Sequence, residues 1–332
     1  MPKQRIVVSA SLPVDDSSSV SEGTVNALNL CMLCCEELPP YGPARETADM
    51  FVQLLMMSNA RLCSFEDTIQ KKRLSSISVT VYHAQHEDYP STTQEWNSFD
   101  GVIIPGSLSS AFDTHIPWIE RLHRVIREEI HVNQRRTLAV CFGHQSFAHA
   151  LGVVASSRKG EAGICPSGKK AGRKSFSMTP VGGRIFAKCS RSQKCEKMSL
   201  EMLYTHGDMV NSLPPVGLSL GGNGDVPVQS AAYFASEEDA LKYEQSFDVA
   251  KEENNFTPPL PYAITFQAHP EFVSPTGFNV NFVNIVQAMK SSNRIDDATA
   301  KEACEDAKQT FDRVKLDSLD AVISVCQVLR WF

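Results

Sequence analysis

A cysteine stands at the end of a short apolar run and just before a helical pattern. Residues 138–140 predict a buried strand of a parallel sheet, Cys141 follows it, and a helix is expected over 144–151. Strand, sharp turn and helix together make a nucleophile elbow, with cysteine where serine stands in many hydrolases. The helix N-terminus favours a thiolate, and the N–H of Phe142 could receive an oxyanion. Cysteine is also a common core residue, so this motif alone leaves both interpretations open.

A second stretch could supply a base and the group that orients it. His269 and Glu271 come directly after the apolar run 261–268, which predicts the last strand. Side chains two residues apart on extended backbone point the same way, so we expect imidazole and carboxylate to be neighbours. Gly106, in the turn that ends another predicted strand, would let a backbone N–H face the same place. Because carboxyl ends of parallel strands share one edge, these segments converge and favour Cys141 as a nucleophile.

Alternating strands and helices must position these residues. We expect strands at 26–33, 77–82, 101–104 and 138–140, with helices beginning at 44 and 117 between them. This alternation predicts an α/β fold of three layers, with a mostly parallel central sheet and helices on both faces. Helical patterns near 278–289, 296–312 and 316–331 add a helical C-terminal tail, whose apolar face must dock on the body or on a second copy of the chain.

The remaining segments are less regular. We expect a mobile N-terminal leader over 1–25, one domain over 26–290 and a helical C-terminal extension over 291–332. The basic segment 156–174 predicts a solvated loop, and the segment 236–261 a surface insertion. Short β-like runs, which predict antiparallel additions to the sheet, lie near 178–187, 200–205, 216–221 and 228–235.

Composition narrows the function classes. The 332 residues are 42% hydrophobic and 21% charged, with a formal net charge of −6, which argues against nucleic acid or an anionic membrane as partner. No run approaches the roughly 20 apolar residues of a membrane span, and no targeting segment is recognised, so we expect a cytoplasmic protein. Ten cysteines are too sparse for a disulfide scaffold. His83 and His86 precede two acidic residues, but a solvated turn is the commoner outcome; we expect no metal site and no cofactor.

Four motifs carry a resemblance to a known family. They are Phe99-Asp-Gly-Val-Ile-Ile-Pro-Gly-Ser107, Cys141-Phe-Gly-His-Gln145, Tyr204-Thr-His-Gly-Asp208 and Phe266-Gln-Ala-His-Pro-Glu271. The four motifs occur in the family's order over roughly residues 26–290, and through them the sequence resembles the class I glutamine amidotransferase family. Within that family it most resembles the stand-alone gamma-glutamyl peptidase branch. The single glycine of the Pro-Gly-Ser turn leans toward that branch.

The resemblance implies roles for named residues. It implies a triad of Cys141 as nucleophile, His269 as base and Glu271 as orienting group. It also implies an oxyanion hole from the backbone of Gly106 and Phe142. The residues that we expect around a small-molecule γ-glutamyl substrate are Gln145, His206, Ser107 and Glu161. The implied reaction cleaves the side-chain amide of glutamine or a γ-glutamyl isopeptide through a thioester that water resolves.

Two other functions stay open at this stage. The chain could be a glutaminase subunit that delivers ammonia to a partner synthase, docking through the C-terminal helices; no synthase pattern accompanies it. It could also be a catalytically silent member that binds or regulates, although the intact cysteine, histidine and glutamate argue against this. A serine hydrolase is disfavoured because no Gly-x-Ser-x-Gly elbow precedes a helix. The preferred γ-glutamyl compound and the oligomeric state are not encoded in any pattern that we recognise.

Overall fold

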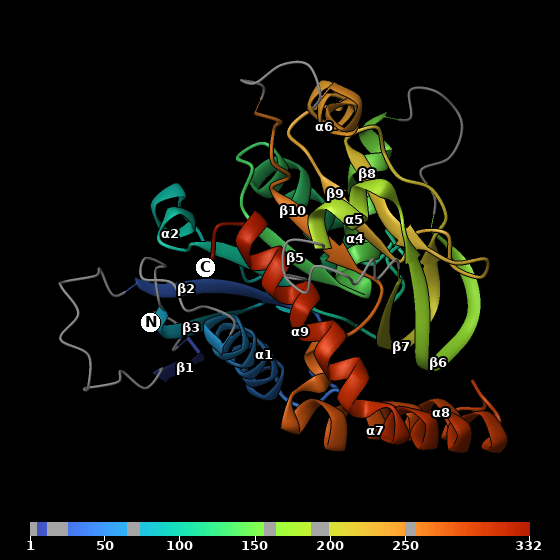
Figure 1. The fold of residues 1–332 in the computed structure, drawn as a ribbon. Helices are drawn as coiled ribbons and strands as arrows, with labels where there is room; N and C mark the ends of the chain where they lie inside the picture. Colours follow the sequence, from blue (N-terminus) through green and yellow to red (C-terminus); the bar gives the residue numbers. More distant parts are fainter. Residues whose placement is uncertain (1–4, 12–25, 65–73, 156–163, 187–198, 250–256) are drawn as a thin grey trace.

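Five parallel strands form the centre of one sheet (Figure 1) in the computed structural model, which describes residues 5–11, 26–64, 74–155, 164–186, 199–249 and 257–332. Each strand pairs in parallel with its neighbours, in the order β3, β2, β4, β5, β10. In that order they span Leu74–His83, Asn26–Cys34, Gly101–Ile104, Thr137–Val140 and Ala263–Phe266. The predicted parallel core is confirmed, and all five carboxyl ends share one edge.

Antiparallel strands extend this core on both sides. β1 (Val7–Ser11) pairs with β3 at one edge. Beyond β10 the sheet continues through β9, β8, β6 and β7, each antiparallel to the strand before it. These strands span Ser230–Tyr233, Gly217–Gly222, Ile164–Met178 and Ser199–Val210. The prediction of antiparallel additions is confirmed.

Helices cover both faces of the sheet, as predicted. On one face lie α1, α5, α7, α8 and α9, and on the other α3 and α4; α2 and α6 lie in connections (Figure 1). α1 to α5 span Ala44–Ser64, Thr93–Asn97, Pro117–Val125, Phe142–Ala155 and Pro180–Phe186. α6 to α9 span Glu237–Val249, Val283–Ser291, Asp297–Gln309 and Phe311–Val328. π-helical turns, Ile126–His131 and Gly277–Phe282, extend α3 and precede α7.

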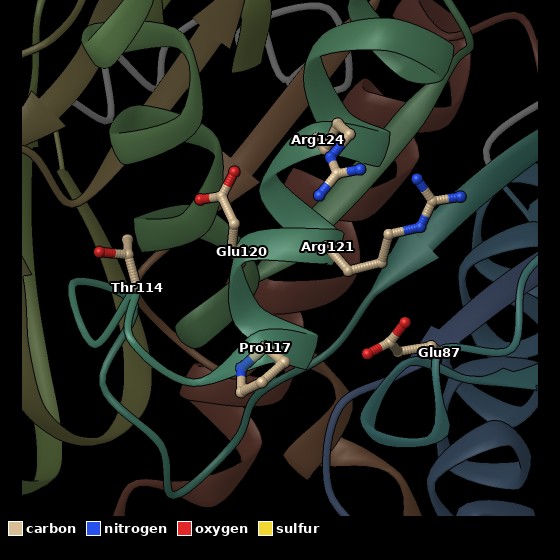
Figure 2. A pocket seen from close by; sticks show the side chains of 6 residues that line it. All are labelled: Glu87, Thr114, Pro117, Glu120, Arg121 and Arg124. Carbon is tan, nitrogen blue, oxygen red and sulfur yellow. The ribbon is translucent and has the colours of Figure 1, made fainter.

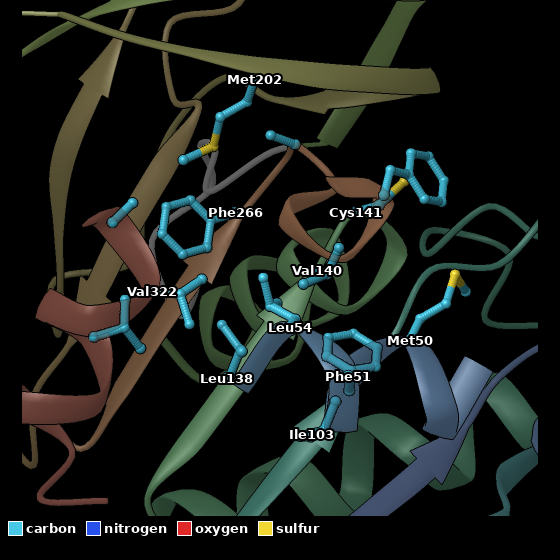
Figure 3. Packing of buried hydrophobic residues seen from close by; sticks show 14 of the residues in the cluster. Met50, Phe51, Leu54, Ile103, Leu138, Val140, Cys141, Met202, Phe266 and Val322 are labelled. Atoms are coloured by element: carbon cyan, nitrogen blue, oxygen red, sulfur yellow. The ribbon is translucent and has the colours of Figure 1, made fainter. Parts of the chain in front are cut away.

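Alternation along the central strands gives the sheet two apolar faces. In β5, Leu138 and Val140 join the core beneath α1 and α9, whereas Ala139 joins the core beneath α3 and α4. Figure 3 shows the first core, with Phe51 of α1 and Val322 of α9 on the sheet, and Cys141 at one end of the cluster. Such two-sided burial is typical of parallel strands and explains why these strands are continuous apolar runs.

The C-terminal helices dock on the body of the same chain. The guanidinium of Arg61 in α1 binds the carboxylate of Asp320 in α9, with N–O distances of 2.6 and 3.0 Å. Past α9, the indole of Trp331 covers Gly101 so closely that a Cβ there would lie 2.5 Å from the ring. The apolar face of the tail is therefore occupied within one copy. Among the described residues, none of the helices combines the length and the apolar character needed to cross a bilayer.

Three local predictions are wrong. Residues 7–11, within the predicted mobile leader, form β1, which pairs with β3 through backbone bonds. Residues 164–174, predicted as solvated loop, belong to β6, whose pairing with β7 overrides its basic composition. Within the β-like run 178–187, residues 180–186 form α5, because Thr179 accepts the N–H of Gly182 at 3.1 Å and Pro180 suits a first helical position.

Gly143 lets the elbow helix lie against β4. A Cβ at this position would lie 2.3 Å from the carbonyl oxygen of Ile104, a backbone atom that cannot move aside. Gly183 in α5 is a matched contrast, since a Cβ there meets nothing within 4 Å. The glycine of the Cys-Phe-Gly motif is thus a packing requirement for the junction of β5 and α4.

We expect Gly143→Ala to lower the free energy of unfolding by about 1–3 kcal/mol, because the added methyl overpacks a backbone contact. Gly183→Ala is the control, and it should leave stability unchanged or raise it by up to about 1 kcal/mol through helix propensity. Urea unfolding followed by circular dichroism measures both variants. Equal midpoints for wild type and Gly143→Ala would contradict the packing argument.

Candidate functional site

Cys141 occupies the junction between β5 and α4 in a left-handed backbone conformation. Its φ angle is +53°, a region that non-glycine residues rarely adopt and that marks the sharp turn of a nucleophile elbow. Its N–H donates to the carbonyl of Phe266 at 2.7 Å, which ties the turn to the end of β10. The residue is 4% exposed, and its sulfur lies 3.8 Å from the carbonyl oxygen of Thr205. Strain of this kind persists where the surroundings hold it.

His269 and Glu271 form a buried hydrogen-bonded pair just beyond β10. Nδ1 of His269 and Oε1 of Glu271 are 2.7 Å apart, and the side chains are 0% and 4% exposed. The N–H of His269 donates to the carbonyl of Leu203 at 2.9 Å, and the ring of Phe272 stacks on the imidazole at 4.2 Å. The expected extended backbone is wrong for Glu271, since residues 270–273 form a turn of 3₁₀-helix, yet the pairing arises.

Gly106 lies between the cysteine and the histidine. A Cβ at this position would lie 3.0 Å from Cε1 of His269, 3.5 Å from Cβ of Cys141 and 3.3 Å from the hydroxyl of Tyr41. A side chain there would crowd these three neighbours, which favours glycine in the Pro-Gly-Ser turn. The structure thus brings together the ends of β4, β5 and β10, as the sequence predicts.

The electrostatics of this cluster favour a protonated imidazole. Burial of the ring opposes the charge, but the carboxylate of Glu271 and the sulfur of Cys141 outweigh it and raise the pKa of His269 from 6.5 to about 10. With Nδ1 bonded to Glu271, Nε2 is the remaining ring nitrogen; it is buried, and the neighbouring group that acts on it is the sulfur of Cys141. That nitrogen is available to exchange protons with a group beside the sulfur.

Phe142 opens α4, so its N–H lies in the first turn, where no carbonyl of the helix can accept it. Its side chain is buried, with ring centroids of Phe142 and Trp118 separated by 5.5 Å. The ring therefore anchors the helix start in the core while the backbone stays beside Cys141. This placement fits the predicted oxyanion donor.

Gln145 and His206 meet at one backbone carbonyl. Nε2 of Gln145 donates to the carbonyl of Asp208 at 2.8 Å, and Nδ1 of His206 lies 3.0 Å from the same oxygen. Nε2 of Gln145 also lies 3.1 Å from Oε1 of Gln267. Burial lowers the pKa of His206 to about 4, so its imidazole is neutral at neutral pH. The two predicted substrate residues are brought together, in a buried polar cluster.

The other predicted residues are placed differently. The hydroxyl of Ser107 is 3.3 Å from Oε2 of Glu36, so its hydrogen bond goes to the protein. Glu161 lies outside the described residues. His144 packs inside, with Nδ1 2.7 Å from the hydroxyl of Thr265, consistent with a packing role. Among the described residues no group of three or more histidine, cysteine or acidic side chains could hold a metal ion.

Sequence reasoning missed two residues beside the cluster, Glu36 and Tyr41. Both are buried, and both lie on the loop that follows β2. Burial, with the negative groups of Cys141 and Glu271 nearby, raises the pKa of the Tyr41 hydroxyl. The position of Glu36 in the sequence could have identified it. It lies two residues after a buried strand, β2, whose carboxyl end is at the same edge of the sheet as those of β4 and β5.

A separate hollow of about 620 Å³ lies along α3 (Figure 2). Arg121 and Arg124 of this helix and Glu87 from the turn after β3 project into it. Its complete lining is Glu87, Thr114, Pro117, Glu120, Arg121 and Arg124. It contains no nucleophile and none of the residues of the Cys141 cluster, so it is distinct from the candidate site.

Comparisons with known proteins bear on the fold of the chain. No family model matches the chain. The chain is 26% identical over 169 residues to a candidate glutamine amidotransferase of Saccharomyces cerevisiae, a match that covers 50% of this chain and 57% of the relative. The chain thus spans little more than half the length of that curated relative.

Two crystal structures of glutamine amidotransferases share the fold over nearly their whole length. The one from Thermotoga maritima is 13% identical, with a TM-score of 0.55 over 91% of this chain and 98% of that chain. The one from Methylobacillus flagellatus is 14% identical, with a TM-score of 0.53 over 92% of this chain and 96% of that chain. In the order of its strands and in the helices on both faces of the sheet, this chain has the fold of these glutamine amidotransferase structures.

Proposed function

We propose that this protein is a cysteine amidohydrolase that cleaves γ-glutamyl amide or isopeptide bonds in small peptides or glutamine. The observation that carries the proposal is a buried cluster in which a Cβ on Gly106 would meet both His269 at 3.0 Å and Cys141 at 3.5 Å, while Glu271 holds Nδ1 of the imidazole at 2.7 Å. A nucleophile, a base, an orienting group and backbone donors are the parts that acyl transfer needs.

The first half-reaction forms a thioester. The sulfur of Cys141 attacks the γ-carbonyl carbon, and the oxygen of the tetrahedral intermediate accepts the N–H groups of Gly106 and Phe142. Nε2 of the His269 imidazolium then gives its proton to the leaving nitrogen, the C–N bond breaks, and the amine or ammonia departs. Glu271 holds the ring so that Nε2 faces the sulfur throughout.

The second half-reaction restores the protein. A water molecule gives a proton to Nε2 of His269 and attacks the thioester carbon. The C–S bond breaks, glutamate is released and the sulfur of Cys141 leaves as thiolate beside the imidazolium. We expect Gln145 and His206 to border the pocket for the γ-glutamyl group, since both are buried polar side chains on the shared carbonyl of Asp208.

Transfer of ammonia to a partner synthase is the competing function. The name of the yeast relative favours it, since an amidotransferase uses the ammonia that its glutaminase releases. The docking of α9 on α1 argues against the C-terminal helices as the partner surface, because their apolar face is already covered.

The decisive assay incubates the purified chain with glutathione, glutamine and several γ-glutamyl dipeptides, and measures both glutamate and ammonia. We expect glutamate without ammonia from the peptides, and a loss of about 10³-fold or more in Cys141→Ala, because no other strong nucleophile stands at the elbow. Ammonia released from glutamine only after a second protein is added would select the competing function. Wild-type rates in Cys141→Ala would refute the nucleophile.

Glu271→Gln should shift the alkaline limb of the kcat/KM profile to lower pH by about one to three pH units. The carboxylate stabilises the imidazolium and raises the pKa of His269, so its removal lets the ring lose its proton earlier. We also expect Glu271→Gln to cost about 10- to 100-fold less activity than His269→Ala, because it misorients a base without removing it. Glu237→Gln, on an exposed turn of α6, is the control. An unchanged profile, or a larger loss than in His269→Ala, would contradict these roles.

Iodoacetamide should alkylate Cys141 ahead of the other described cysteines. Cys141 stands at the start of a helix and beside the imidazole of His269, whereas burial raises the pKa of Cys31 and Cys35 and brings that of Cys34 to about 12. Peptide mass mapping after short exposure gives the order of labelling, and Cys141→Ser identifies the fast site. Labelling of Cys34 before Cys141, or uniform labelling, would count against an activated thiol.

A further inference from the structure

The buried carboxylate of Glu36 joins two loops, the one after β2 and the one after β4. The second loop carries the candidate oxyanion turn at Gly106. Glu36, 4% exposed, lies two residues after the end of β2. Its Oε1 accepts the N–H groups of Glu37 at 3.0 Å and Leu38 at 3.1 Å, both on its own loop. Its Oε2 accepts the hydroxyl of Ser107 at 3.3 Å and the N–H of Leu108 at 3.1 Å, on the loop after β4. Each of the two carboxylate oxygens thus binds a different loop.

These four hydrogen-bond donors compensate for the removal of the Glu36 carboxylate from water. A buried carboxylate is costly unless its oxygens are well hydrogen-bonded or paired with a cation. Within the described ranges no lysine or arginine forms an ion pair with Glu36, so amide and hydroxyl donors satisfy it. Hydrogen bonds to an ionised acceptor are about twice as strong as neutral ones, which makes this carboxylate an effective link between loops.

Both linked loops reach the reacting cysteine. Ser107 follows Gly106, which lies against Cys141 and His269. On the other loop the N–H of Tyr41 donates to the carbonyl of Leu38 at 3.0 Å, and the Tyr41 hydroxyl lies 3.3 Å from the place of a Cβ on Gly106. Glu36 therefore holds the turn directly, through residues 107 and 108, and indirectly, through the loop that carries Tyr41.

We propose that Glu36 is a positioning residue that fixes the Gly106 turn, so that the N–H of Gly106 is held toward the oxygen that becomes negative during attack by Cys141. This inference rests on the proposed function. Glu36 neither touches the substrate nor exchanges a proton; its two oxygens stay bonded to the two loops. Donors held in place before the reaction stabilise the oxyanion without reorganising, which is the source of their effect.

Glu36→Gln tests this role at nearly constant shape. The amide keeps one oxygen for two donors but turns an NH₂ group toward the other two, so one loop loses its bonds. Because losing one oxyanion donor costs about 10²–10³ in kcat, we expect a loosened donor to lower kcat by about 10- to 100-fold with less than about a threefold change in KM. Wild type and variants are compared on the best γ-glutamyl peptide from the substrate panel.

A second measurement separates positioning from general damage. Alkylation of Cys141 by iodoacetamide displaces iodide from a saturated carbon and forms no oxyanion, so its rate should stay within about twofold of wild type in Glu36→Gln. The matched control is Glu95→Gln in α2, where a carboxylate also accepts three hydrogen bonds, from Tyr82, the Ser91 hydroxyl and the Ser91 N–H, at 2.7, 2.9 and 2.6 Å. It should change neither rate.

The outcomes are distinct. A fall in kcat with normal alkylation supports the inference, and partial activity in Glu36→Asp, which keeps a shorter carboxylate, strengthens it. Unchanged kcat in Glu36→Gln, or kcat and alkylation falling together, overturns it. If Glu36→Gln does not fold, the same two rates in Glu36→Asp decide. If wild type hydrolyses no γ-glutamyl bond, or Cys141→Ala retains activity, the proposed function fails, and the inference with it.

Discussion

One backbone hydrogen bond, from the N–H of Cys141 to the carbonyl of Phe266 at 2.7 Å, sets the geometry of the candidate site. It continues the parallel pairing of β5 and β10, in which Val140 lies opposite Phe266. Because the two strands end level with each other, the turn after one and the segment after the other emerge at the same height. A cysteine and a histidine separated by more than a hundred residues thereby reach one place.

The core on either face maintains this register. A parallel strand slipped by one residue would exchange the side chains that point to the two faces, and each face here is filled by helices. α1 and α9 close one side and α3 and α4 the other, with α9 fastened to α1 by the pair between Arg61 and Asp320. The C-terminal helices are therefore part of the scaffold that keeps the strand ends aligned.

Much of the site could be predicted because it lies on strand ends. Short apolar runs, each followed by a glycine, cysteine or histidine, are visible in one sequence, and they located Cys141, Gly106 and His269 at a shared edge. The local conformation of Glu271 was predicted wrongly, because Pro270, whose fixed φ suits a first helical position, opens a 3₁₀ turn over residues 270–273. Glu36 and Tyr41 were missed since their partners lie on another loop, a relation that no spacing along the chain records.

The contact between Gly143 and the carbonyl of Ile104 has a consequence for how the protein could accept different substrates. It holds the start of α4, which follows Cys141, against the end of β4, which leads to Gly106. The turns at Cys141 and Gly106 therefore share one frame. In the proposed reaction, the spacing between the N–H groups of Gly106 and Phe142 would then not depend on the amine attached to the γ-glutamyl group. Under the proposed function, tolerance for leaving groups of different size would come from the surrounding loops, while the spacing at Gly106 and Phe142 is kept.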